Sequence, residues 1–281
     1  MFRRILISFG CSHSAGSEID GVGDSDYNRQ NSYGAILTKK FGFERHINYA
    51  LCGGSNQRIF TLTTQVLSEI INNESKMIPF PREHCEYFFL IGWTGLNRFD
   101  LRYSEDNDYI YHQCGDAGDM VDPKIIPACA GMNPRLIDEV DKRRALDHIH
   151  DITDDRIMAD YLASYIFSLQ TLFKYHQVEY YMFNAIENFY KTDGFHKDRL
   201  TPIRNGKTHM SWRPGNTIIY DNIDTKYYYH PKSRTKNYYR WCLAKGHTNQ
   251  SNKYWHLGQA AHQDWADHIY PEIINVYPHL G

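Results

Sequence analysis

A serine directly after a short apolar run is the first candidate for chemistry in this sequence. Residues 5–9 are apolar apart from one serine, the run breaks at Gly10, and Ser12 follows. Such a run is too short to cross a bilayer and is typical of a buried strand in a parallel sheet. Ligands of open α/β sheets bind at the carboxyl ends of strands, and a serine hydroxyl there is a nucleophile once a base is near. A simpler role also fits, since Ser12 and Ser14 are good caps for a following helix.

Two more loops of small residues and one late histidine complete a set of groups suited to acyl transfer. Gly53 and Asn56 follow a second predicted strand, Thr94 follows a third, and His256 stands just before the last predicted helix. A serine needs a base to take its proton, and neutral imidazole suits that role at pH 7. The negative oxygen of a tetrahedral intermediate needs preorganised donors, which the N–H groups of Ser12 and Gly53 can supply.

The elements that must position these residues alternate between strand and helix along the chain. Strands are expected at residues 4–9, 45–51, 85–91 and 178–184. Helices are expected at 32–41, 58–72 and 259–269, and a further long helix capped by Asp154 or Asp155 is expected to reach residue 175. This alternation predicts an α/β fold, a three-layer α/β/α sandwich with a central, mostly parallel sheet. We expect one domain over residues 1–281, with irregular insertions at about 99–153 and 190–252.

The loops and the histidine resemble the four sequence blocks of the SGNH/GDSL hydrolase family, in the same order and along nearly the whole chain. Gly10-Cys11-Ser12 stands where the family has Gly-Asp-Ser, so Ser12 resembles the nucleophile. Residues 48–56 resemble the second block, whose glycine gives an oxyanion N–H, and Gly53 fits that position best. The resemblance implies a flavodoxin-like SGNH hydrolase fold and a serine hydrolase without a cofactor.

The third and fourth blocks of the family are matched by Gly92-Trp93-Thr94 and by His256. The family has Gly-x-Asn in the third block, so Thr94 takes the place of the asparagine that completes the oxyanion hole. His256 resembles the catalytic base. The spacing of Trp93 and Thr94 from Arg98 is reminiscent of SGNH-like proteins from tailed bacteriophages.

The acid that orients the histidine is missing from its usual place. The family usually has an aspartate three residues before the histidine, and this chain has Lys253 there. In serine-protease triads, disabling the acid costs on the order of 10⁴ in turnover. A backbone carbonyl or an acid from elsewhere, such as Asp221, Asp224 or Glu187, is therefore expected to orient His256.

We assign Asn56, Trp93 and Arg98 to substrate binding. Arg98 fits an ion pair with a core carboxylate equally well, and His262 is expected to be a structural histidine. The chain has 22 tyrosines, several of them between residues 220 and 239. Tyrosine-rich surfaces suit sugar or protein recognition because each ring offers apolar area and a hydroxyl. The expected substrate is an ester, most directly an O-acetyl or other O-acyl group of a carbohydrate.

Composition excludes several other classes of protein. The formal net charge is −2, which argues against a general nucleic-acid or membrane-surface binder. No stretch approaches the roughly 18 apolar residues of a membrane helix, and no export signal is recognised. The six cysteines form no CxxC pair, so neither a metal site nor a disulfide framework is expected. We expect a cytoplasmic protein, or a virion component if a phage encodes it.

Two other functions remain open from the sequence. A catalytically weakened SGNH fold could serve as a binding or structural module, for instance in a phage particle, as the missing acid and Thr94 suggest. Basic and aromatic residues interleave between 220 and 241, a pattern that can bind single-stranded nucleic acid. The slightly acidic chain favours a lid or packing role for that region.

Overall fold

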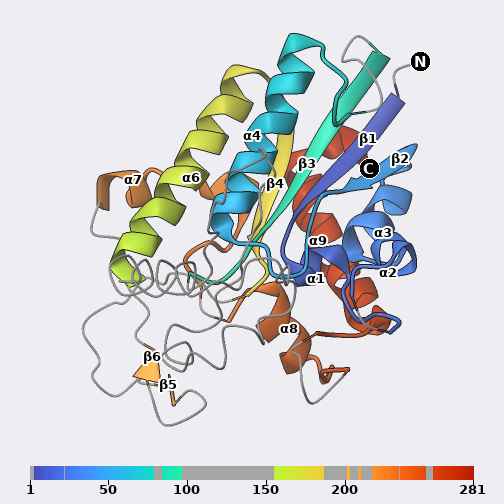
Figure 1. Cartoon of the computed structure of the whole chain (residues 1–281), viewed down its shortest axis with the longest axis vertical. Coiled ribbons are helices and arrows are strands. Elements are labelled where there is room, and N and C mark those ends of the chain that lie inside the picture. Colours follow the sequence, from blue (N-terminus) through green and yellow to red (C-terminus); the bar gives the residue numbers. More distant parts are fainter. Residues whose placement is uncertain are drawn as a thin grey trace, which may run out of the picture.

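The computed structural model describes residues 3–21, 23–78, 84–96, 155–186, 201–202, 208–209, 217–233, 235–250 and 256–281. The predicted insertion at residues 99–153 lies outside this described part of the chain. Within it, helices are layered on a central five-stranded sheet (Figure 1).

The central sheet consists of parallel strands in the order β2-β1-β3-β4-β7. These strands are β1 (Arg3–Gly10), β2 (Arg45–Asn48), β3 (Cys85–Trp93), β4 (Glu179–Asn184) and β7 (Tyr228–Tyr229). A separate antiparallel pair joins β5 (Thr201–Pro202) to β6 (Thr208–His209). In the central sheet, β1 and β3 pair from Arg3↔Cys85 to Gly10↔Gly92, so both strands end at the same level.

Helices follow the strands and cover both faces of the sheet. The described helices are α1 (Ser12–Ala15), α2 (Asp26–Gln30), α3 (Tyr33–Lys40), α4 (Asn56–Asn72), α6 (Asp155–Tyr175), α7 (Thr217–Asp221), α8 (Tyr238–Ala244) and α9 (Gln259–Val276), with 3₁₀ turns η4 (Thr225–Tyr227) and η5 (Pro278–Leu280). Figure 1 shows α4 and α6 on one side of the sheet and α9 on the other.

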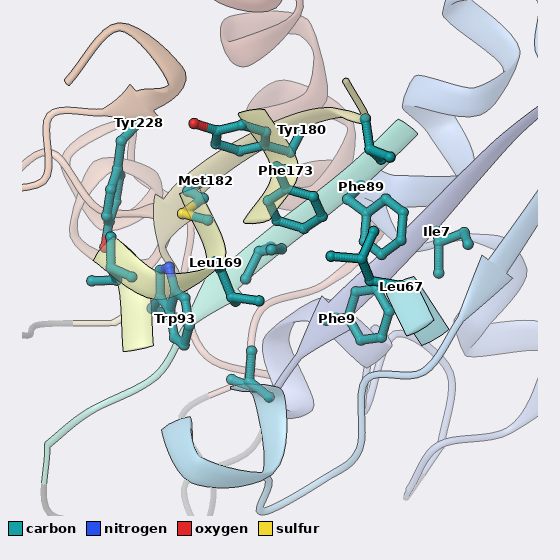
Figure 2. Packing of buried hydrophobic residues seen from close by; sticks show 14 of the residues in the cluster. Ile7, Phe9, Leu67, Phe89, Trp93, Leu169, Phe173, Tyr180, Met182 and Tyr228 are labelled. Carbon is teal, nitrogen blue, oxygen red and sulfur yellow. The ribbon is translucent and has the colours of Figure 1, made fainter. Parts of the chain in front are cut away.

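Successive residues of β1 face two different cores, as the period of a strand requires. Ile5 and Ile7 lie in the core under α4 and α6, and Leu6 lies in the core under α3 and α9. Figure 2 shows the first core, where the rings of Phe9 and Phe89 stack with centroids 5.6 Å apart. Each fully buried apolar side chain of this kind stabilises the fold by about 1.5–3 kcal/mol. The predicted three-layer α/β/α sandwich with a parallel sheet is confirmed.

The last helix is longer than the predicted 259–269. Helix α9 continues through Pro271 to Val276. A proline inside a helix costs about 3 kcal/mol because it lacks an N–H and clashes with the preceding turn. The turns beyond it persist because Ile273 is buried and its carbonyl accepts the Tyr277 N–H at 2.9 Å. Tertiary packing therefore overrides the local stop signal.

The predicted irregular region 190–252 contains regular structure in the part that is described. It supplies α7, α8 and the edge strand β7, which pairs with β4 at Met182↔Tyr228 and Phe183↔Tyr229. Several of its tyrosines are buried, namely Tyr220, Tyr228, Tyr229 and Tyr238. The interpretation of this cluster as a tyrosine-rich recognition surface is therefore wrong for these four rings, which pack the cores.

None of the helices in the described ranges is both long and apolar enough to cross a membrane.

Candidate active site

Ser12 begins helix α1 at the carboxyl end of β1. The N-cap of α1 is Cys11, whose carbonyl accepts the N–H groups of Ser14 and Ala15 at 2.9 and 3.0 Å. Ser12 is thus the first residue of the helix rather than its cap, and it is only 2% exposed. N–H groups in a first helical turn have no partner within the helix. No described residue accepts a hydrogen bond from the Ser12 N–H, so it remains a donor for a ligand.

Two glycines at paired positions of the sheet make room beneath α1. A Cβ on Gly10 would lie 1.9 Å from Oγ of Ser14, and a Cβ on Gly92 would lie 2.6 Å from the same atom. The hydroxyl of Tyr33, on α3, donates a hydrogen bond to that oxygen. Ser14 is therefore a structural serine that anchors α1 to the sheet, and the glycines are required by this close approach.

The second glycine loop packs directly on the first. A Cβ on Gly54 would lie 3.1 Å from the carbonyl oxygen of Gly10 and 3.7 Å from Cα of Cys11. Gly53 has a φ of +83°, a left-handed conformation that residues with a side chain rarely adopt. Among the described residues, none accepts a hydrogen bond from the Gly53 N–H. Ser12 and Gly53 thus bring two unengaged donors to neighbouring loops.

A partly buried network of hydrogen bonds around Arg29 holds the second loop. Nη1 of Arg29 donates to the carbonyl oxygens of Asn48 and Ala50 at 2.7 and 2.8 Å. Asp24 lies 3.7 Å from Nη2 of the same guanidinium and accepts the Cys52 N–H at 2.6 Å. Hydrogen bonds in which one partner is charged are shorter and stronger than neutral ones. The chain before Gly53 is therefore fixed by charged side chains from the segment that contains α2.

Asn56 joins the second loop to the third. Its Oδ1 accepts the Thr94 N–H at 2.9 Å, and its Nδ2 donates to the Thr94 carbonyl at 3.0 Å. Ser55 caps α4 and accepts the N–H of Arg58 at 3.1 Å, which places Asn56 in the first turn. Both ends of the Asn56 amide are thus engaged with the backbone of Thr94. This geometry supports a positioning role for Asn56 more directly than the predicted substrate contact.

His256 lies beside a carboxylate that the sequence did not indicate. Its Nδ1 is 3.1 Å from Oε2 of Glu18, and both side chains are largely buried. The predicted alternatives lie elsewhere, because Asp221 pairs with Lys232 at 3.7 Å and Asp224 pairs with Lys174 at 2.6 Å. Glu187, the third alternative, falls outside the described residues. Glu18 is therefore the acid that the structure brings to His256.

The ring of His256 also contacts the residue next to the serine. His13 follows Ser12 on α1, and the rings of His13 and His256 meet edge to face with centroids 5.5 Å apart. Tyr238 and Tyr239 pack on the other sides of His13, with centroids at 5.5 and 5.6 Å. Helix α8 thus closes over α1, and the histidine predicted as the base is held beside the predicted nucleophile's helix.

His262 is a structural histidine, as expected. Its ring stacks on Tyr33 with centroids 5.3 Å apart, and its Nδ1 accepts the Tyr33 N–H at 3.3 Å. Burial, with a smaller electrostatic contribution from His256, lowers the pKa of His262 to about 3. The ring is therefore neutral near pH 7 and serves as a hydrogen-bond acceptor inside the second core.

Two of the residues assigned to substrate binding are placed differently or not described. Trp93 is completely buried in the core under α4 and α6, as Figure 2 shows, which is the environment of a packing residue. Its indole is therefore not in a position to touch a substrate. Arg98 lies outside the described residues.

Sequence reasoning missed Glu18 because the acid was sought late in the chain. The available signal was the position of Glu18 in the loop directly after α1, six residues from Ser12.

Within the described ranges, no cluster of three or more histidine, cysteine or acidic residues could hold a metal ion.

The fold and the site define an α/β protein with a serine, a histidine–glutamate pair and two glycine-containing loops at the carboxyl end of its sheet. The chain belongs to the Family of unknown function (DUF6071), whose family model matches residues 16–204. That range includes Glu18, Gly53 and Thr94 but stops short of Ser12 and His256 at either side.

Other known proteins resemble the chain more distantly. No curated protein matches it by sequence. Among solved structures, TesA is similar at 11% identity over 97% of this chain and 99% of that chain, with a TM-score of 0.41. Phospholipase A1 from Streptomyces albidoflavus NA297 is similar at 14% identity over 69% of this chain and 64% of that chain, with a TM-score of 0.26.

Proposed function

We propose that this protein is an SGNH-like serine hydrolase that cleaves an ester. The observation that carries the proposal is the 3.1 Å contact between Nδ1 of His256 and the carboxylate of Glu18. In the SGNH family an aspartate three residues before the histidine usually orients it, and this chain has Lys253 there. In this proposal Glu18 takes the role of that aspartate. The ring contact of His256 with His13, next to Ser12, supports the same assignment.

In the first half of the proposed reaction, Nε2 of His256 takes the proton of the Ser12 hydroxyl as its oxygen attacks the ester carbonyl. The imidazolium that forms is stabilised by the Glu18 carboxylate, and the pair interacts strongly because both groups are shielded from water. The N–H groups of Ser12 and Gly53 hold the oxyanion, together with the hydroxyl of Thr94. Losing one such donor typically costs about 3–4 kcal/mol.

In the second half, the tetrahedral intermediate collapses and the ester's C–O bond breaks. The leaving alkoxide takes the proton from His256 and departs as an alcohol, which leaves an acyl group on Ser12. Water then attacks that acyl group while His256 accepts its proton, and the free acid leaves as the proton returns to the serine. Each step uses only side chains and backbone N–H groups of this chain and one water molecule.

The burial of Ser12 favours a short acyl group. With the serine 2% exposed and Gly54 packed against Cys11, a long chain has little room at the nucleophile. We propose an acetyl ester as the substrate, and an O-acetylated carbohydrate as its natural form. The carbohydrate part rests on the sequence pattern alone, because most tyrosines of the 220–239 cluster are buried.

The test is hydrolysis of p-nitrophenyl acetate by the wild type and by Ser12→Ala. We expect the variant to lose at least about 10³-fold in kcat/KM, since removal of a triad nucleophile has a large effect. Ser68→Ala is the matched control, because Ser68 is exposed on α4. Equal rates for the wild type and Ser12→Ala would exclude the mechanism.

The alternative is a binding or structural module with a weakened site. One observation favours it, since the Thr94 N–H is already engaged by Asn56 and cannot serve the oxyanion. A fluorophosphonate probe separates the two functions, because it labels only an activated serine. Labelling of the wild type that disappears in Ser12→Ala supports the hydrolase, and no labelling together with no ester hydrolysis supports the module.

A further inference from the structure

A pocket of about 540 Å³ opens between strand β7 and the carboxyl-terminal half of α9. Its walls come from η4 and β7 on one side and from α9 on the other, with the pocket running past Tyr181 of β4. Its volume is within the usual range for small-molecule sites. The pocket shares no lining residue with the candidate active site, and in the strand order β7 is separated from β1 by β3 and β4.

Two lysines supply positive charge to the wall that β7 and its flanking turns form. Nζ of Lys226 lies 5.1 Å from the ring centroid of Tyr227, and Nζ of Lys232 lies 4.4 Å from that of Tyr220. The face of an aromatic ring attracts a cation, so these contacts hold the two ammonium groups in place beside the rings. Lys232 has a partial counter-charge in Asp221, 3.7 Å away.

The opposite wall carries a carboxylate and an amide, which can accept hydrogen bonds. Glu272 and Asn275 line the pocket from α9, and Glu272 is the acidic residue among its described lining residues. A carboxylate accepts hydrogen bonds from hydroxyl groups, and an amide both donates and accepts. The pocket is therefore cationic on one side and a hydroxyl acceptor on the other.

The turn that follows β7 is built to hold this arrangement. His230 has a φ of +40°, a strained conformation for a residue with a side chain, and its carbonyl accepts the Ser233 N–H at 3.0 Å. Its Nε2 contacts Nζ of Lys236 at 3.3 Å. Burial and the charge of Lys236 lower the pKa of His230, so the ring is neutral near pH 7. Strained backbone of this kind clusters at ligand sites.

We propose that this pocket binds a small hydroxylated molecule with one anionic group, of the class of sugar phosphates and sugar acids. Lys226 and Lys232 would hold the phosphate or carboxylate. Glu272 and Asn275 would accept and donate hydrogen bonds to the hydroxyl groups. This site is separate from the proposed hydrolase site and does not depend on esterase activity.

Isothermal titration calorimetry of the full chain tests the proposal with four probes: glucose 6-phosphate, glucuronate, glucose and inorganic phosphate. We expect saturable binding of one or both anionic sugars, and binding of glucose and of phosphate weaker by about tenfold or more, since each lacks one half of the recognition. The comparison of glucose 6-phosphate with glucuronate identifies the anionic group. No saturable binding of either anionic sugar would overturn the proposal.

Three variants assign that binding to this pocket. The double variant Lys226→Gln, Lys232→Gln should weaken binding of the anionic sugar at least about tenfold, and Lys39→Gln, on the exposed face of α3, should not change it. Glu272→Gln should weaken the anionic sugar but leave inorganic phosphate bound as well or better, because a nearby negative charge is removed. An anionic sugar that binds the double variant as tightly as the wild type would show that the pocket is not the site.

Discussion

A carboxylate beside the far nitrogen of a histidine base fixes the ring's tautomer and stabilises the positive charge that the ring acquires. Oε2 of Glu18 lies 3.1 Å from Nδ1 of His256, the proposed base, and burial strengthens their interaction because the medium around the pair screens little. Glu18 has a φ of +66°, an uncommon conformation for a residue with a side chain. Its backbone is therefore held in a costly shape at the point where its side chain meets the histidine.

Glu18→Gln tests this pair in the proposed hydrolase. The variant keeps the side-chain shape but removes the charge, so we expect kcat/KM for p-nitrophenyl acetate to fall on the order of 10²–10⁴. The melting temperature should change little, which a thermal scan would check.

Glu44→Gln is the matched control, because Glu44 is exposed and pairs only loosely with Arg3 at 3.6 Å. Glu18→Asp should recover part of the activity if charge is what matters. Activity of Glu18→Gln equal to that of the wild type would remove Glu18 from the mechanism.

At the scale of elements, the site depends on loops that hold one another. Asn56, at the start of α4, forms direct hydrogen bonds with both the N–H and the carbonyl of Thr94. Asn56→Ala would leave a buried N–H and a buried carbonyl without their partner. We expect a loss of about 1–3 kcal/mol in the free energy of unfolding, measured by urea denaturation.

The control for that variant is Asn72→Ala, at the exposed end of the same helix. It should change the free energy of unfolding by less than about 0.5 kcal/mol. A loss of the same size in both variants would mean that helix propensity, and not the bridge to Thr94, accounts for the effect.

The glycines beneath α1 make a second prediction at this scale. Gly92→Ala places a Cβ 2.6 Å from Oγ of Ser14 and 2.9 Å from Cζ of Phe183, so we expect a destabilisation of about 1–3 kcal/mol. In a Ser14→Ala background the same substitution should cost less, because one of the two clashes is gone. Urea unfolding of the four proteins of this double-mutant cycle provides the measurement, and a coupling of zero would contradict the packing described.

The strands and long helices could be predicted from sequence because their signals are local. Runs such as residues 85–91 are apolar throughout, and the helix over 58–72 has its apolar residues at helical spacing, so β3 and α4 lie where expected. β7 could not be predicted, because a two-residue strand has no period of its own and forms through its pairing with Met182.

The candidate site was predictable only where a local pattern marked it. Ser12 and Gly53 lie in turns that could be predicted from small residues in the sequence, and the two loops are in contact in the structure. Glu18 has no local mark, because its role comes from a contact with a residue near the other end of the chain. The position of Trp93 at the end of a strand suggested substrate binding. The sequence did not indicate that its indole packs into the core.

The whole molecule should lose stability as the pH falls below about 6.5, and His262 is one cause. Its pKa is about 3 in the folded protein and about 6.5 for an ordinary histidine, so the unfolded chain binds the extra proton first. The contribution of His262 to the free energy of unfolding has its full value above pH 6.5. It falls by about 1.4 kcal/mol per pH unit between pH 6.5 and pH 3.

His262→Gln removes the titrating ring but keeps an oxygen that can accept the Tyr33 N–H. We expect the slope of unfolding free energy against pH between 6 and 4 to become shallower by about 1.4 kcal/mol per unit. Urea unfolding at several pH values measures this. An unchanged slope would show that His262 takes up its proton without unfolding the protein.

The packing of α3 on α9, with Lys40 and Asp267 2.7 Å apart, has a consequence for how the protein is made. During translation the nascent chain exposes Leu37 and the sheet face beneath α3 until α9 leaves the ribosome, because α9, which covers that surface, is synthesised more than 200 residues after α3. The contact between Glu18 and His256 likewise cannot form until His256 has been synthesised. A ribosome-bound chain halted before His256 would therefore expose this surface to chaperones and would lack the proposed base, so the proposed hydrolysis would begin only after the segment with His256 and α9 had been made.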